Sequence, residues 1–127
     1  MEQEYGLAKS ERLSSLAAVR RLFSDGTAGF VYPFRYTYFA DRSTTPSGVE
    51  VLFSVPKRFH KRANRRNLLR RRTKEAYRLS KRALLDAVEQ KGVALDLSLV
   101  YSTKDVLPYK TIENAVRKIL AELVERV

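Results

Sequence analysis

The sequence predicts an α+β fold in which helices pack against a single β-sheet. Three segments alternate apolar and polar residues as half-buried strands do, and amphipathic helical patterns precede, separate and follow them. A chain of 127 residues suits one domain with a modest core. We therefore expect a single domain over residues 1–127, in which residues 1–9 are a candidate disordered segment.

The first half of the chain predicts a short helix followed by strands. Apolar residues fall on one side of the segment 15–23, which predicts the helix. The segment 30–40 alternates along an aromatic-rich run, and Pro33 suits the start or the edge of a strand. A turn-forming loop over 41–48 leads to a second alternation over 49–55. We expect these two strands to pair as a hairpin.

The second half predicts a long helix, a strand and a final helix. The pattern is helical over about 63–88, where apolar residues gather on the side marked by Leu69. The segment 93–101 is a clear strand alternation, and Pro108 suits the first turn of a last helix. The apolar residues of that helix follow the i, i+3, i+4, i+7 rule.

Positive charge is concentrated between Lys57 and Arg82. This window holds 13 of the 25 lysines and arginines and one acid, Glu75, so its net charge is 13 − 1 = +12 against +11 for the whole chain. Such a concentration indicates a polyanionic partner. Arginine predominates in the window, and its planar fork suits bidentate contact with phosphate.

The charged side of the long helix favours phosphate binding over a merely solvated surface. Several cations lie four residues apart, where like charges repel by about 0.2–0.5 kcal/mol per pair. Others crowd the N-terminus, which the helix dipole makes unfavourable for cations. Phosphates relieve both kinds of repulsion. The residues that we assign to RNA binding are Lys57, Arg58, Lys61, Arg62, Arg65, Arg66, Asn67, Arg70, Arg71, Lys74 and Arg78, and the same cationic stripe includes Lys81 and Arg82.

The composition excludes several other classes of function. No cysteine is present, which removes disulfides and thiolate chemistry and suits the reducing cytoplasm that we expect for this protein. We find no signal peptide and no apolar stretch long enough to span a membrane. The acids are unpaired in sequence, and the single histidine, His60, is an RNA contact or an inert loop residue. We predict no catalytic residue and no metal site in the protein.

The residues 63–77 carry a specific resemblance. They resemble the Arg-Asn signature that opens the basic helix of the protein subunit of bacterial ribonuclease P, although Leu68 replaces a usual arginine. The segment 53–58 is similar to the strand that precedes this helix in the family. The segments 9–13 and 19–26 resemble the first helix of the family. Leu107-Pro108-Tyr109 and the last helix resemble its C-terminus, so the resemblance spans almost the whole chain.

The resemblance implies a particular fold and a particular division of labour. The fold is a two-layer sandwich of the ribosomal-protein type, in the order α-β-β-β-α-β-α, with a left-handed β-α-β crossover. Its sheet has four strands, so a short extra strand is expected near residues 27–33. The catalytic RNA would carry out the Mg²⁺-dependent removal of the 5′ leader from precursor tRNA. The protein alone would be inactive and would bind no cofactor.

The resemblance also implies two binding surfaces and a set of partners. The basic helix would hold the catalytic RNA, and a cleft beside the first helix would hold the single-stranded leader. The cleft residues are Val19, Phe23, Arg35, Tyr36 and Thr37, with Tyr36 included in case the register is shifted by one. The expected partners are the catalytic RNA and precursor tRNA, bound by a protein monomer in a 1:1 complex with the RNA, without membrane or DNA.

The sequence leaves competing functional classes of protein open. A non-catalytic RNA-binding protein of the ribosomal type would also carry a basic helix on a small α+β domain. A DNA-binding basic-helix protein would require a dimerisation element, and the last helix is too short to form a leucine-zipper coiled coil. A stand-alone nuclease is the least favoured class, because the sequence shows no cluster of metal ligands.

Overall fold

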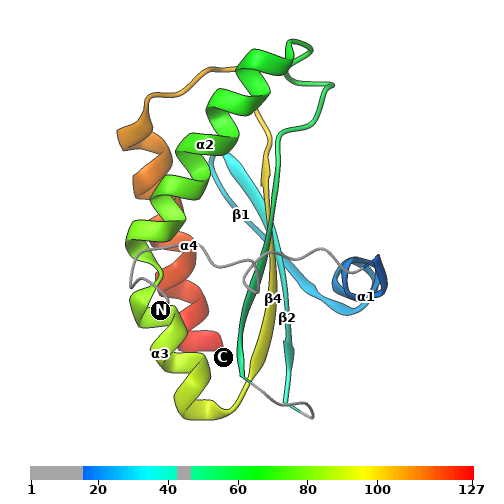
Figure 1. The fold of residues 1–127 in the computed structure, drawn as a ribbon, viewed down its shortest axis with the longest axis vertical. Helices are drawn as coiled ribbons and strands as arrows, with labels where there is room; N and C mark the ends of the chain where they lie inside the picture. The colour runs from blue at the N-terminus through cyan, green and yellow to red at the C-terminus, as the bar shows by residue number, and fades with distance from the viewer. Residues whose placement is uncertain (1–15, 43–46) are drawn as a thin grey trace, which may run out of the picture.

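The computed structural model describes residues 16–42 and 47–127 as an open four-stranded sheet with helices (Figure 1). The expected disordered segment 1–9, the similarity at 9–13 and the centre of the 41–48 loop lie outside the described residues. In chain order the elements are α1 (Leu16–Asp25), β1 (Thr27–Val31), β2 (Phe34–Asp41), β3 (Gly48–Ser54), α2 (Ala63–Ser80), α3 (Arg82–Lys91), β4 (Ala94–Tyr101) and α4 (Tyr109–Arg126).

The sheet has the strand order β1-β2-β4-β3, which confirms the short extra strand and corrects the expected hairpin. β2 pairs with β1 and with β4 in antiparallel fashion, whereas β3 pairs with β4 in parallel. The segments 30–40 and 49–55 are therefore not neighbours, because β4 lies between them. In this central place β4 is buried along most of both faces. Its leucines alternate and therefore all line the inner face, whereas Asp96 and Ser98 are buried on the other face.

The long basic helix is two helices. The prediction of one helix over 63–88 is wrong, since α2 ends at Ser80, α3 begins at Arg82 and Lys81 lies between them. A straight helix of that length would span about 39 Å, whereas an eight-residue strand such as β4 spans about 27 Å. The chain changes direction between the two helices, which lie on the same face of the sheet (Figure 1). Gly92 closes α3 in the left-handed conformation, at φ 64°.

The helices lie on both faces of the sheet (Figure 1). α2, α3 and α4 cover one face, which we call the inner face, and α1 lies against the opposite, outer face. The core fills the space between the inner face and its helices, and Leu97, Leu99, Tyr77 and Ile119 are completely buried there. Each such aliphatic side chain contributes about 1.5–3 kcal/mol by leaving water.

The last helix packs along this core with one apolar side. Its buried residues are Ile112, Ala115, Val116, Ile119, Leu120 and Leu123, as the sequence pattern predicts. Pro108 is the residue before the first turn rather than within it. In the described part of the chain, the apolar stretches of the helices fall short of what a membrane span requires.

Candidate nucleic-acid interface

The loop before α2 and the solvent side of α2 form a strongly cationic surface. Seven of the predicted RNA-binding residues are exposed here, and we call them the basic surface. They are Lys57, Arg58, Lys61, Arg62, Arg65, Asn67 and Arg71. The N-terminus of α2 has no side-chain cap and no acid in its first turn, so no acid of that turn offsets these cations. This arrangement suits a phosphate backbone.

The other four predicted RNA-binding residues are half-buried and make contacts within the protein. Arg66 donates from Nη1 to the carbonyl oxygens of His60 and Lys61, at 3.1 Å and 2.7 Å. Arg70 donates to Asn67 Oδ1 at 3.1 Å. Lys74 Nζ lies 6.0 Å from the centre of the Phe53 ring, and Arg78 pairs with Glu75 one turn earlier. Arg66 therefore shapes the loop in addition to carrying charge.

His60 is a structural residue of this loop. Its side chain is 3% exposed, and its Nε2 lies 2.8 Å from the carbonyl oxygen of Thr103. Its ring centre lies 5.7 Å from that of Tyr101 at the end of β4. Of the two sequence interpretations of His60, the inert loop residue fits this position and the RNA contact does not.

Two further cations of the window point away from the basic surface. Lys81 is 2% exposed at the junction of α2 and α3, so its predicted place on the cationic stripe is wrong. Arg72 donates from Nη1 to the carbonyl oxygen of Leu107 at 2.6 Å, which ties α2 to the segment before α4. Charge in the sequence window therefore exceeds the charge that faces solvent.

Arg21 fastens α1 to the outer face of the sheet. Its Nη1 lies 3.1 Å from Asp41 Oδ2 on β2, and its Nη2 lies 3.3 Å from Asp96 Oδ2 on β4. Its guanidinium also lies 4.8 Å from the centre of the Phe39 ring. Leu22 is the buried apolar residue of α1, so Leu22 and Arg21 together seat the helix.

The opposite side of α1 carries exposed apolar residues. At 100° per residue, Val19 and Phe23 lie about 160° around the helix from Arg21. Phe23 is 54% exposed, and Val19 is half-buried. Because Arg21 reaches toward the Asp41 end of β2, ideal helix geometry directs these two side chains toward the other end, where Arg35 is exposed.

Phe30 belongs with these residues and was missed by sequence reasoning. It pairs with Arg35 across β1 and β2, so both side chains lie on the outer face, and Phe30 is 56% exposed. We call Val19, Phe23, Phe30 and Arg35 the outer-face patch. The alternation of side chains in the extra strand that the resemblance predicted could have placed Phe30 on the same face as Arg35.

The structure places the last two predicted cleft residues differently. Thr37 lies on the outer face but is 8% exposed, beneath the passage from α1 to β1. Gly26 allows this close passage over β2, since a Cβ there would lie 2.8 Å from Tyr38 O and 3.0 Å from Thr37 Cγ2. Tyr36 is on the inner face and 3% exposed, so its placement in the cleft is wrong. Neighbouring residues of a strand point to opposite faces, which separates Tyr36 from Arg35.

The acids of the outer face lie at the far end of the sheet from Arg35. Burial raises the pKa of the Asp96 carboxyl, although the hydrogen bond from Arg21 opposes this shift. Glu50 is the partner of Asp96 across the parallel pair β3–β4. Burial and the Asp96 carboxylate raise the pKa of Glu50. Over residues 16–42 and 47–127, no group of three or more acidic or histidine side chains is arranged to hold a metal ion.

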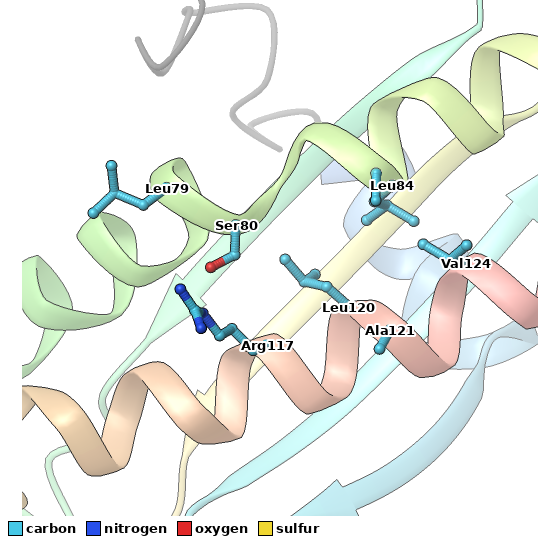
Figure 2. A pocket seen from close by; sticks show the side chains of 8 residues that line it. Leu79, Ser80, Leu84, Arg117, Leu120, Ala121 and Val124 are labelled. Carbon is cyan, nitrogen blue, oxygen red and sulfur yellow. The ribbon is translucent and has the colours of Figure 1, made fainter.

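A separate apolar groove lies on the helical layer (Figure 2). It encloses about 360 Å³ between the α2–α3 junction and α4, and its lining includes Leu79, Leu120 and Val124, with Ser80 and Arg117 at one end. None of the predicted site residues lines it. The groove is therefore distinct from both the basic surface and the outer-face patch.

The fold and its surfaces define a small α+β protein of a class suited to RNA binding, with a cationic surface and an exposed apolar patch on different elements. Comparison with known proteins identifies the family within this class, because a family model described as Ribonuclease P matches residues 7–124. The chain belongs to the ribonuclease P protein family. This assignment replaces the ribosomal, DNA-binding and stand-alone nuclease alternatives.

Relatives and solved structures agree with the family. Two proteins named "Ribonuclease P protein component", from two strains of Porphyromonas gingivalis, are each 31% identical over 123 residues, covering 97% of this chain and 90% of the relative. The Staphylococcus aureus RNase P protein has a TM-score of 0.72 at 18% identity, covering 90% of this chain and 95% of that one. The Thermotoga maritima RNase P protein has a TM-score of 0.65 at 20% identity, covering 92% and 97%. These structures confirm the fold class, and the handedness of the crossover stays a prediction.

Proposed function

We propose that this chain binds the 5′ leader of precursor tRNA with its outer-face patch while its basic surface holds the catalytic RNA. As a member of its family, the chain is a subunit of the ribonucleoprotein enzyme that processes tRNA 5′ ends, and its partners are the ribonuclease P RNA and the tRNA substrate. The further proposals are a 1:1 complex with the RNA and a cytoplasmic location.

The observation that carries this proposal is the separation of the two surfaces. The basic surface is almost purely cationic and suits the backbone of a folded RNA, which is bound through its phosphates. The outer-face patch joins the exposed rings of Phe23 and Phe30 to the cation Arg35. Exposed aromatic rings stack on unpaired bases, for about 1–3 kcal/mol per base, and a neighbouring cation can bind the phosphate between them. A single-stranded leader presents both groups.

We further propose that the RNA carries the chemistry. The described residues offer neither a cluster of metal ligands nor an acid–base pair with histidine, since His60 is held by the Thr103 carbonyl. When bound to the RNA, Mg²⁺ would supply the activated water and stabilise the developing charge on the phosphate. The role of the protein is then to orient the substrate and to raise its affinity.

Reconstitution tests this proposal. RNA-free protein with Mg²⁺ and precursor tRNA should give no product, and addition of the catalytic RNA should give one cut at the mature 5′ end. The reconstituted enzyme should also bind precursor with a leader more tightly than mature tRNA, and removal of the protein should abolish that preference. Cleavage by the protein alone, or a preference that survives its removal, would contradict the proposal.

A further inference from the structure

Among the described residues, α1 makes few side-chain contacts that fix its position on the sheet. It has 10 residues, and helices of this length are marginal in water unless tertiary contacts hold them. Leu22 supplies the buried apolar contact, but a single leucine fixes neither the rotation of a helix about its axis nor its direction. Within the described part of the chain, the contacts of Arg21 can do so, because they join one point of α1 to two different strands.

The guanidinium of Arg21 is held on three sides. Asp41 of β2 and Asp96 of β4 each accept a hydrogen bond from a different terminal nitrogen, at 3.1 Å and 3.3 Å. The Phe39 ring lies 4.8 Å away on a third side. The carboxylates are mostly buried, with side-chain exposures of 11% and 7%, so they form a fixed platform. A planar fork between two fixed carboxylates defines an orientation that a lysine ammonium cannot reproduce.

This orientation determines where the leader-binding side of α1 points. Phe23 and Val19 lie about 160° around the helix from Arg21, so a rotation of α1 about its axis moves them toward or away from Arg35. The displacement matters because stacking and phosphate contact must be made by one ligand at the same time. Arg21 itself faces the acidic end of the sheet, where one carboxylate accepts a hydrogen bond from each of its two terminal nitrogens.

We propose that Arg21 is a positioning residue for leader recognition, which holds α1 so that Phe23 and Val19 face Arg35. The inference rests on the proposed leader-binding function and deepens it. Arg21 acts through the outer-face patch rather than on the RNA. It makes no contribution of its own once the aromatic contact that it positions has been removed.

A double-mutant cycle in the reconstituted holoenzyme tests the inference. The variants are Arg21→Met, Phe23→Ala and the two combined. The control is Arg20→Met, which removes the same charge from an exposed neighbour on the same helix. The measurements are KM and kcat for precursor tRNA, the affinity for mature tRNA, and the affinity of each protein for the catalytic RNA.

We expect Arg21→Met to raise KM for precursor tRNA by about fivefold or more. The kcat, the affinity for mature tRNA and the affinity for the catalytic RNA should be unchanged. In the Phe23→Ala background the same substitution should change KM by less than about twofold, since the contact that it positions is gone. Arg20→Met should leave KM within about twofold. Arg21→Lys should also raise KM for precursor, because lysine keeps the positive charge but lacks the planar guanidinium. If Arg21→Met fails to fold, Arg21→Lys takes its place in the cycle.

Three results would overturn the inference. An Arg21 effect that persists in full on top of Phe23→Ala would show that Arg21 contacts the leader directly. An equal loss with Arg20→Met would show that general charge is responsible. An unchanged KM in the Arg21 variants, with Phe23→Ala still defective, would remove Arg21 from leader recognition and leave the proposed function standing. A Phe23→Ala variant with full leader preference would instead overturn the proposed function itself.

Discussion

The hydroxyl group of Tyr36 donates a hydrogen bond of 2.9 Å to Oε2 of Glu122, which joins β2 to α4 through the core. The adjacent residue, Arg35, is exposed on the other face of the same strand. Two consecutive residues of β2 therefore serve different ends, because Tyr36 stabilises the fold and Arg35 is available to a ligand. Burial and this hydrogen bond both raise the pKa of Tyr36.

Tyr36→Phe should lower stability without affecting leader recognition. The substitution removes the hydrogen bond to Glu122 and keeps the buried ring, so the loss of unfolding free energy should be about 1 kcal/mol. Chemical denaturation measures this loss, and the ratio of precursor to mature tRNA affinity in the holoenzyme should be unchanged. A lower ratio at unchanged stability would return Tyr36 to the leader site.

Phe23→Ala should weaken leader recognition without lowering stability. The ring is 54% exposed, so its removal leaves no cavity and the melting temperature should change little. Loss of stacking on one base should reduce the preference for precursor over mature tRNA by about tenfold, the factor that corresponds to 1.4 kcal/mol. Affinity for the catalytic RNA should stay constant. A loss of several kcal/mol in stability would instead identify Phe23 as a core residue.

Arg71→Ala should weaken binding of the catalytic RNA and reduce its salt dependence. Arg71 is exposed on the basic surface, and each phosphate contact contributes about 0.7–0.9 to the slope of log K against log salt. Lys118→Ala is the matched control, because Lys118 is an exposed cation on α4. Equal slopes for wild type and the Arg71 variant would exclude Arg71 from the interface.

Arg66→Ala should differ from Arg71→Ala in its effect on the fold. The lost like-charge repulsion alone would stabilise α2, but Arg66 also donates to the carbonyls of His60 and Lys61. We therefore expect Arg66→Ala to lower both RNA affinity and the melting temperature, whereas Arg71→Ala lowers only the affinity. The melting curves of the two free variants compare them directly, and an unchanged melting temperature for the Arg66 variant would show that its carbonyl contacts do not stabilise the loop.

Glu50→Gln should stabilise the protein at neutral pH. The folded-state pKa of Glu50 is raised by burial and by Asp96, so the folded protein holds this proton more tightly than the unfolded chain does. Ionisation then costs stability as pH rises through the raised pKa, and the variant avoids that cost. The gain in melting temperature should be present at pH 7 and should disappear at about pH 4 and below, near the pKa of a free glutamate. A gain that is the same at both pH values would have another cause.

Local periodicity determined the kinds of elements and the character of the main interface. The alternation over 93–101 and the helical repeat after Pro108 correspond to β4 and α4 almost residue for residue. The concentration of cations between Lys57 and Arg82 predicted a polyanion-binding element, and seven of the predicted residues are exposed in the structure. These signals depend on side-chain spacing within one segment, and the sequence contains that spacing in full.

The tertiary structure alone decided which surfaces those segments present. The position of β4 between β2 and β3 depends on contacts between distant segments, and it made the expected hairpin wrong. The break at Lys81 has no counterpart in the helical periodicity of the segment, and the burial of His60 depends on the loop that carries Thr103. Arg21 shows the same limit, since Asp41 and Asp96 are 20 and 75 residues away in the chain. Periodicity depends only on the side-chain spacing within one segment, whereas burial depends on the other segments that pack against it.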